Sequence, residues 1–122
     1  MIEKDKYLID LKEDKKMMHI KVWGFFKQED AQNFIEDYKN IVSNINAENY
    51  TLAADSTGLK TSAQENIPLL KSCMEMYMDD NFDNIAIINP DNMIAKNQAK
   101  RIAKECNFTG SFVDNYEKAQ QL

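Results

Sequence analysis

The sequence has few of the side chains on which disulfide and zinc sites depend. Among its 122 residues there are two cysteines and one histidine. Cys73 and Cys106 are far apart, lie within helical patterns and form no Cys-x-x-Cys motif. A zinc site requires more nitrogen and sulfur ligands than His19 and these two thiols provide. We therefore expect free, mostly buried thiols in a reducing compartment, and no cofactor.

Positive charge is also scarce. The chain has 15 lysines and arginines against 20 acidic residues, a net charge of −5. Phosphate contacts need clustered lysine and arginine side chains, so the composition argues against a nucleic-acid partner. The small cluster of Lys12, Lys15 and Lys16 is interrupted by Glu13 and Asp14, which is typical of a solvated turn.

No apolar run approaches the roughly 20 residues that a membrane-spanning helix requires. The charged residues from Glu3 to Lys6 do not resemble a signal peptide. We therefore expect a cytoplasmic protein without an integral membrane segment. The 43% hydrophobic content is ordinary for a globular protein, and 122 residues are enough for one domain with a real core.

The first half of the chain predicts a hairpin followed by a helix. Two alternating segments, Tyr7–Lys12 and Met17–Phe26, flank a polar turn and should pair antiparallel. From Ala31 to Ile45, apolar residues recur at the i, i+3, i+4, i+7 spacing of an amphipathic helix that packs on a sheet.

The second half predicts three strand–helix units. The strand at Tyr50–Ala54 is nearly all apolar, which is typical of a strand covered on both faces. The residues Asp55-Ser56-Thr57-Gly58 indicate a turn, because their side chains bond their own backbone. A helix over about Ala63–Asp80 follows, with Pro68 in its first turns. The next unit is a strand at Asn84–Ile88 and a helix to about Cys106, which is capped by Asp91 or Asn92 and has Ile94 among its inward residues. The last unit is a strand at Ser111–Val113 and a short helix at Tyr116–Gln121 capped by Asp114.

This order predicts an α/β fold with a single domain over residues 1–122. An N-terminal antiparallel hairpin followed by strand–helix units implies a mixed β-sheet of about five strands, packed with about four helices. In open α/β sheets, ligand and partner sites gather at the carboxyl ends of the strands.

The element order, and the apolar strand that ends at Asp55 before Gly58 and Leu59, resemble the STAS domain of anti-sigma-factor antagonists, in particular its STAS-like or SEC14-like branch. The apolar helix positions Ile67, Leu69 and Leu70 match as well. The resemblance covers essentially the whole chain in element order. It implies a STAS-like fold and a regulatory, protein-binding role; the SEC14-like label implies an apolar or lipid ligand instead.

In antagonists of this family, a serine at the start of the central helix is phosphorylated to break a partner complex. Their Asp-Ser-Ser/Thr-Gly-Leu pattern resembles the residues from Asp55 to Leu59, but this string directly follows the strand, one loop earlier than in the family. Aligned without gaps, the acceptor position falls on Gln64, and the nearest hydroxyls are those of Thr61 and Ser62. Ser62 could take a phosphate at a helix N-terminus. Alternatively, it caps the helix in a box with Glu65.

Two candidate chemistries also have ordinary structural explanations. Asp55, Asn89, Asp91 and Asp114 follow parallel strands and could converge as oxygen ligands for Mg²⁺ or Ca²⁺, although these residue types also serve turns and caps. We expect no metal site. His19 could act as a base, but no nucleophile is placed for it, so we expect a structural or exposed histidine and no enzyme activity. The Asp55–Gly58 turn lacks the pattern of nucleotide-binding loops.

The remaining candidates are surfaces. Met76 and Met78 cannot both face the sheet, and exposed methionines suit an adaptable protein-binding surface. Trp23 and Phe25 share one face of the predicted hairpin and could form a dimer or ligand surface. We therefore expect a non-catalytic interaction or regulatory module whose site includes Asp55, Ser56, Thr57, Gly58, Ser62, Gln64, Met76 and Met78. Its partner would be a protein, with a homodimer or a small apolar ligand as alternatives.

Overall fold

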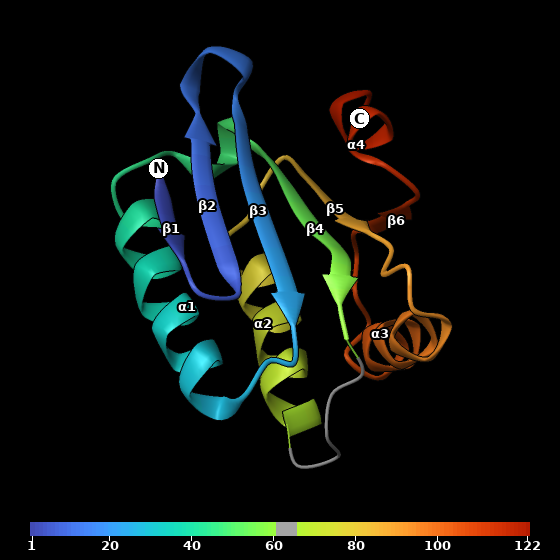
Figure 1. Cartoon of the computed structure of the whole chain (residues 1–122). Coiled ribbons are helices and arrows are strands. Elements are labelled where there is room, and N and C mark those ends of the chain that lie inside the picture. The colour runs from blue at the N-terminus through green and yellow to red at the C-terminus, as the bar shows by residue number, and fades with distance from the viewer. Residues whose placement is uncertain (61–65) are drawn as a thin grey trace.

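A computed structural model describes residues 1–60 and 66–122 of the chain. Across these residues, six strands form one sheet whose spatial order follows the chain (Figure 1). The first three strands pair antiparallel and the last four pair parallel, so the sheet is mixed, as predicted. The strands are β1 (Ile2–Lys4), β2 (Tyr7–Lys12), β3 (Met17–Gly24), β4 (Thr51–Leu59), β5 (Asn84–Ile88) and β6 (Ser111–Val113).

The strand β1 was not predicted. It has only three residues, two of them charged, and so carries no alternating apolar pattern. Its pairing with β2 and an ion pair from Lys4 Nζ to Asp37 Oδ2, 2.8 Å long, hold it in place. Because that contact is tertiary, the local sequence contains no sign of it.

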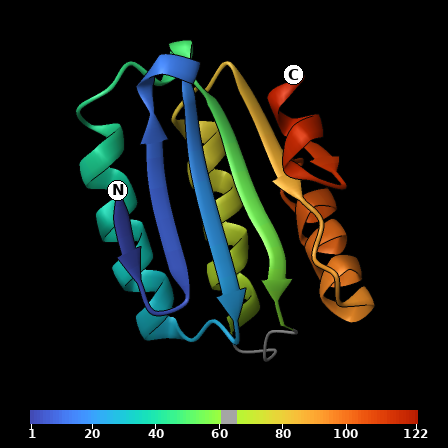
Figure 2. The ribbon, with the colours of Figure 1, turned by 45° about the horizontal axis from the view of Figure 1, so that its top comes forward.

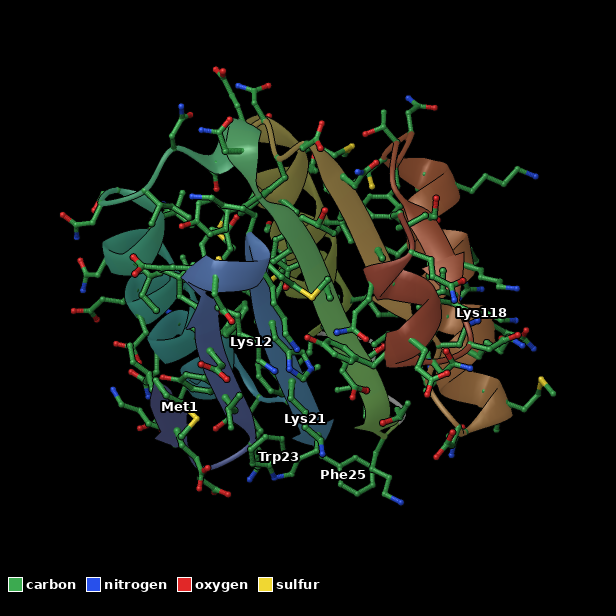
Figure 3. The ribbon with its side chains drawn as sticks, turned by 90° about the horizontal axis from the view of Figure 1, so that it is seen from above. Met1, Lys12, Lys21, Trp23, Phe25 and Lys118 are labelled. Carbon is green, nitrogen blue, oxygen red and sulfur yellow. The ribbon has the colours of Figure 1, made fainter. Side chains whose placement is uncertain are left out.

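The helices divide between the two faces of the sheet. Figures 1 and 2 show α1 (Gln28–Val42), α2 (Ile67–Asp79) and α3 (Met93–Glu105) together on one face. The short α4 (Tyr116–Gln120) lies on the opposite face, where Ala119 packs against Ala53 and Ala86 (Figure 3). No helix of the described residues is long and apolar enough to cross a membrane.

The main core lies between the sheet and the three long helices. Alternate residues of β2 and β3 point into it, and Ile9, Met18 and Ile20 are fully buried there. Phe34 and Tyr38 of α1 meet them, with Phe34 packed edge-on against Tyr7 at 5.5 Å between ring centroids. This arrangement confirms the predicted period of two in the hairpin and of 3.6 in α1.

The turn predicted at Asp55–Gly58 is wrong: β4 continues through these residues to Leu59. Its neighbour β3 extends to Gly24, and the pair accommodates the polar string with a register shift between Lys21 and Trp23. Ser56 points inward and donates to the carbonyl of Ile88 on β5. The polar residues therefore form hydrogen bonds within the sheet. Strand pairing stabilises the extended conformation more than their preference for turns opposes it.

Other boundaries differ by a few residues. Gly24, with φ of +77°, ends β3 two residues before the predicted end. Pro68 lies in the first turn of α2, as predicted, whereas the predicted start of that helix at Ala63 lies outside the described residues. Asn115, not Asp114, caps α4 by accepting from the Lys118 N–H, and Asn92 caps α3.

The prediction that Ile94 faces inward is also wrong, because its side chain is 65% exposed. Ala95 takes the inward position in the first turn of α3, where it is 3% exposed. Successive residues of a helix are turned by about 100°, so Ile94 is directed away from the sheet.

Candidate functional site

The residues Asp55, Ser56, Thr57 and Gly58 do not form an open binding loop. Asp55 Oδ1 accepts from the Thr57 N–H at 3.0 Å and from Thr57 Oγ1 at 2.8 Å. This carboxylate oxygen is therefore hydrogen-bonded to a residue two positions along the same strand. Ser56 is 6% exposed. Gly58 is exposed and lies opposite Trp23, where an added Cβ would come within 2.9 Å of the Trp23 Cβ. The glycine therefore makes room for the indole.

The predicted phosphorylation and capping site cannot be placed. Ser62, Gln64 and the adjoining Thr61 lie outside the described residues. Both roles of Ser62 therefore stay predictions.

The polar residues at the carboxyl ends of the parallel strands bond one another and the backbone. Asn89 Nδ2 donates to Asp114 Oδ1 at 3.2 Å, and the Asp91 N–H donates to the Thr57 carbonyl at 3.1 Å. The Asn89 Oδ1 atom is buried and has no hydrogen-bond partner in the part of the chain that the structure describes. Among the described residues, no group of three His, Cys, Asp or Glu side chains is placed to hold a metal. These contacts join the segments that follow β5 and β6 to one another and to β4.

A hollow on the helical face lies between α1 and α2, which run side by side in Figures 1 and 2. We call it the α1–α2 groove. It has a volume of about 460 Å³. Its lining residues are Ile35, Lys39, Ser72, Glu75, Met76, Asp79 and Asp80.

The α1–α2 groove has apolar side chains within a polar rim. Ile35 and Met76 are half-buried against the core, while Lys39, Glu75 and Asp79 are exposed. Met76, one of the two methionines predicted to reach the surface, therefore does so in part. Met78 is also half-buried, but it does not line this groove.

A part-buried hydrogen bond lies at the end of the α1–α2 groove, at its lining residue Asp80. The hydroxyl of Tyr38, which is 0% exposed, donates to Asp80 Oδ2 at 2.7 Å. Burial and the neighbouring Asp80 carboxylate raise the pKa of Tyr38 far above its ordinary value. This tyrosine therefore stays a neutral donor, and it joins α1 to the end of α2.

An apolar cavity of about 80 Å³ lies deeper, between α2, α3 and the sheet. Almost all of its lining is hydrocarbon or thiol, and Ser56 and Gln98 are its polar members. Both of these polar residues have interactions of their own. An apolar cavity of about 150 Å³ is enough to bind benzene, so this one accommodates only a few heavy atoms as it stands.

The two thiols are not activated. Cys73 and Cys106 are free, as predicted. Burial raises the pKa of the Cys73 thiol to about 12. Burial also raises the pKa of Cys106, with the neighbouring Glu75 adding to the effect. Both cysteines are therefore protonated at neutral pH, whereas a nucleophilic cysteine requires a thiolate.

His19 lies on the other face of the sheet, beneath α4. The Tyr116 ring lies 4.4 Å from the imidazole, and the imidazole Nε2 atom is buried without a hydrogen-bond partner in residues 1–60 and 66–122. Burial lowers the pKa of His19 and Lys12 lowers it further, against the opposing effect of Asp55 and Asp10. The lowered pKa and the packing against Tyr116 fit a neutral structural histidine.

Trp23 and Phe25 lie near one another at the lower edge of this same face (Figure 3). Phe25 is 61% exposed, whereas Trp23 is half-buried. Trp23 lines a shallow hollow of about 470 Å³ together with Lys21, Gly58 and Asp91. Phe25 does not line this hollow, so a surface formed jointly by Trp23 and Phe25 stays a prediction.

Sequence reasoning did not identify the groove between α1 and α2. Ile35 was assigned to the inward stripe of α1, and Lys39, Glu75 and Asp79 were assigned no role. The spacing of these residues was the available signal for a shared surface. Ile35 and Lys39 are four residues apart on α1, so they lie on one face of that helix. Glu75 and Asp79 have the same spacing on α2. Only the packing of the two helices brings these faces together.

Comparison with solved structures identifies the fold of this chain. No protein-family model and no curated protein match the sequence. Among solved structures, the chain is similar to an uncharacterised protein of the DUF3478 family from Shewanella loihica PV-4, which has a SpoIIAA-like fold. The TM-score is 0.66 at 17% sequence identity, and the match covers 94% of this chain and 90% of the other. The chain therefore has a SpoIIAA-like fold, which is the STAS-like fold predicted from its sequence.

Proposed function

We propose that this protein is a non-catalytic, regulatory interaction module whose α1–α2 groove contacts a partner protein. The observation that carries the proposal is the partial exposure of Met76 and Ile35 in a hollow of about 460 Å³. Flexible methionine beside a branched aliphatic side chain suits a surface that packs against another protein. The raised pKa values of the two thiols, and the packing of His19 against the Tyr116 ring, support a non-catalytic role.

The test compares partner capture by three forms of the chain. Met76→Ala shortens a side chain in the α1–α2 groove, and we expect it to weaken capture about tenfold, as for the loss of an interface anchor. Met93→Ala is the matched control, because Met93 is 65% exposed on α3 and lies outside the groove. Thermal melting of all three forms reports folding. Equal capture by the wild type and Met76→Ala would count against the groove.

A small apolar ligand is the second candidate, and the cavity between α2 and α3 favours it. Such a ligand would be a few atoms in size, or the end of a longer chain, since the cavity measures only about 80 Å³. Native mass spectrometry of gently purified protein would detect a retained molecule. Ala99→Leu should displace that molecule by filling the space, because Ala99 lines the cavity. If Ala99→Leu retains as much ligand as the wild type, the ligand binds outside this cavity.

A second copy of the chain is another candidate partner. The exposed Phe25 beside Trp23 supports this alternative. The same native spectrum measures the oligomeric state directly. A dimer that Phe25→Ser converts to monomer would assign this patch to self-association.

A further inference from the structure

The charges around the α1–α2 groove are predominantly of one sign. Three carboxylates, from Glu75, Asp79 and Asp80, line it, against the single ammonium group of Lys39. The whole chain also carries a net charge of −5. A cationic partner segment is therefore attracted to this surface, and an anionic one is repelled.

Two of these carboxylates are available to a partner. Asp80 already accepts from the Tyr38 hydroxyl. Glu75 and Asp79, in contrast, are exposed and make no ion pair within 4.0 Å among residues 1–60 and 66–122. Because they are four residues apart on α2, they lie one turn apart on the same edge of the groove.

The apolar side chains lie across the same hollow. Ile35 comes from α1 and Met76 from α2, and both are half-buried. An amphipathic helix that lies between two neighbouring helices presents apolar anchors at intervals of three or four residues, with its charged residues at the rim. This pattern matches an apolar floor beside one acidic edge.

We propose that the α1–α2 groove binds a basic amphipathic helix of a partner protein. Its apolar anchor packs on Ile35 and Met76, and its lysine or arginine side chains face Glu75 and Asp79. This inference rests on the proposed function and adds the chemistry of the partner.

The probe is a synthetic 14-residue helix of leucine and lysine with its leucines on one face. A peptide with glutamate in place of lysine, and a scrambled peptide of the same composition, are its controls. Binding is followed by NMR titration of the full chain at several salt concentrations. We expect the first peptide to shift Ile35 and Met76 resonances, with an affinity that falls as salt rises. Equal binding by the scrambled peptide, or shifts confined to other surfaces, would overturn the inference.

Charge variants sharpen the test. Glu75→Gln combined with Asp79→Asn should weaken peptide binding about three- to tenfold, which is typical of losing two rim ion pairs. Lys39→Gln should strengthen it about twofold, because it removes the repelling charge. Glu13→Gln combined with Glu117→Gln changes the net charge equally at exposed positions outside the groove, and should have little effect.

Failure of this inference can be told apart from failure of the proposed function. If Met76→Ala weakens capture of the natural partner while the acidic double variant behaves like its charge-matched control, the groove is an interface but its partner is not basic. If Met76→Ala leaves that capture unchanged, the groove is not the interface and both proposals fall.

Discussion

The two faces of the sheet differ in what covers them. On one face, three helices bury Tyr7, Ile9 and Ile20 to 1% exposure or less. On the other, the same two strands present Asp10 and Lys21, and among the helices of the described residues the short α4 alone covers the surface, over Ala53 and Ala86. The comparison teaches that the fold depends on one apolar layer, while the second face contributes packing at a single small patch.

Truncation in the main core should have the largest effect. Phe34→Ala removes a ring that is 1% exposed between Tyr7 and Phe26, and we expect it to lower the free energy of unfolding by about 3–5 kcal/mol. Leu8→Ala on the other face should cost about 1 kcal/mol or less, because Leu8 is half-buried there. Urea denaturation measures both. Similar costs for the two variants would contradict the difference between the faces.

Loosening α4 should have an intermediate effect. Tyr116→Ala removes the ring that lies over His19, and we expect a loss of about 1 kcal/mol, typical of an aromatic pair. Hydrogen exchange should show faster exchange in residues 116–120 and unchanged exchange in β2. Glu117→Gln, an exposed change on the same helix, is the control. A global loss of protection would mean that α4 belongs to the main cooperative unit.

The smallest effect should come from pH acting on His19. Burial is the largest cause of its lowered pKa in the folded protein, followed by Lys12, so folding favours the neutral imidazole. The stabilisation is complete well above the unfolded value of about 6.5 and is lost as pH falls towards the folded pKa. Urea midpoints at pH 7.5 and 5.0 should therefore differ more for the wild type than for His19→Gln. An identical pH dependence of the two proteins would contradict this role.

The sequence predicts an element well where its pattern is local. The strand β5 is correct at both ends, because Ile85 to Ile88 form an apolar run bounded by polar residues. The end of β4 could not be predicted, because Ser56 and Thr57 have the composition of a turn. They remain in the strand because β3 runs beside them and Ser56 bonds the carbonyl of Ile88, a residue distant in the sequence.

The candidate site was predicted only in part. Met76 was identified because neighbouring methionines on one helix cannot all face inward. The acidic edge formed by Glu75 and Asp79 could not be predicted from the sequence. Exposed carboxylates on a helix are ordinary solvated residues until a second helix lies beside them. Whether a residue lines a groove depends on helix packing, which no local pattern encodes.

The strand order has a consequence for the synthesis of this chain. Because each strand pairs with strands next to it in the chain, none has to be inserted between two that have already paired. On a ribosome, the hairpin and α1 emerge before β4, β5 and β6, and each later strand can join the free edge that its predecessor leaves. The sheet can therefore grow in one direction as translation proceeds, with each new strand pairing with the strand before it in the chain.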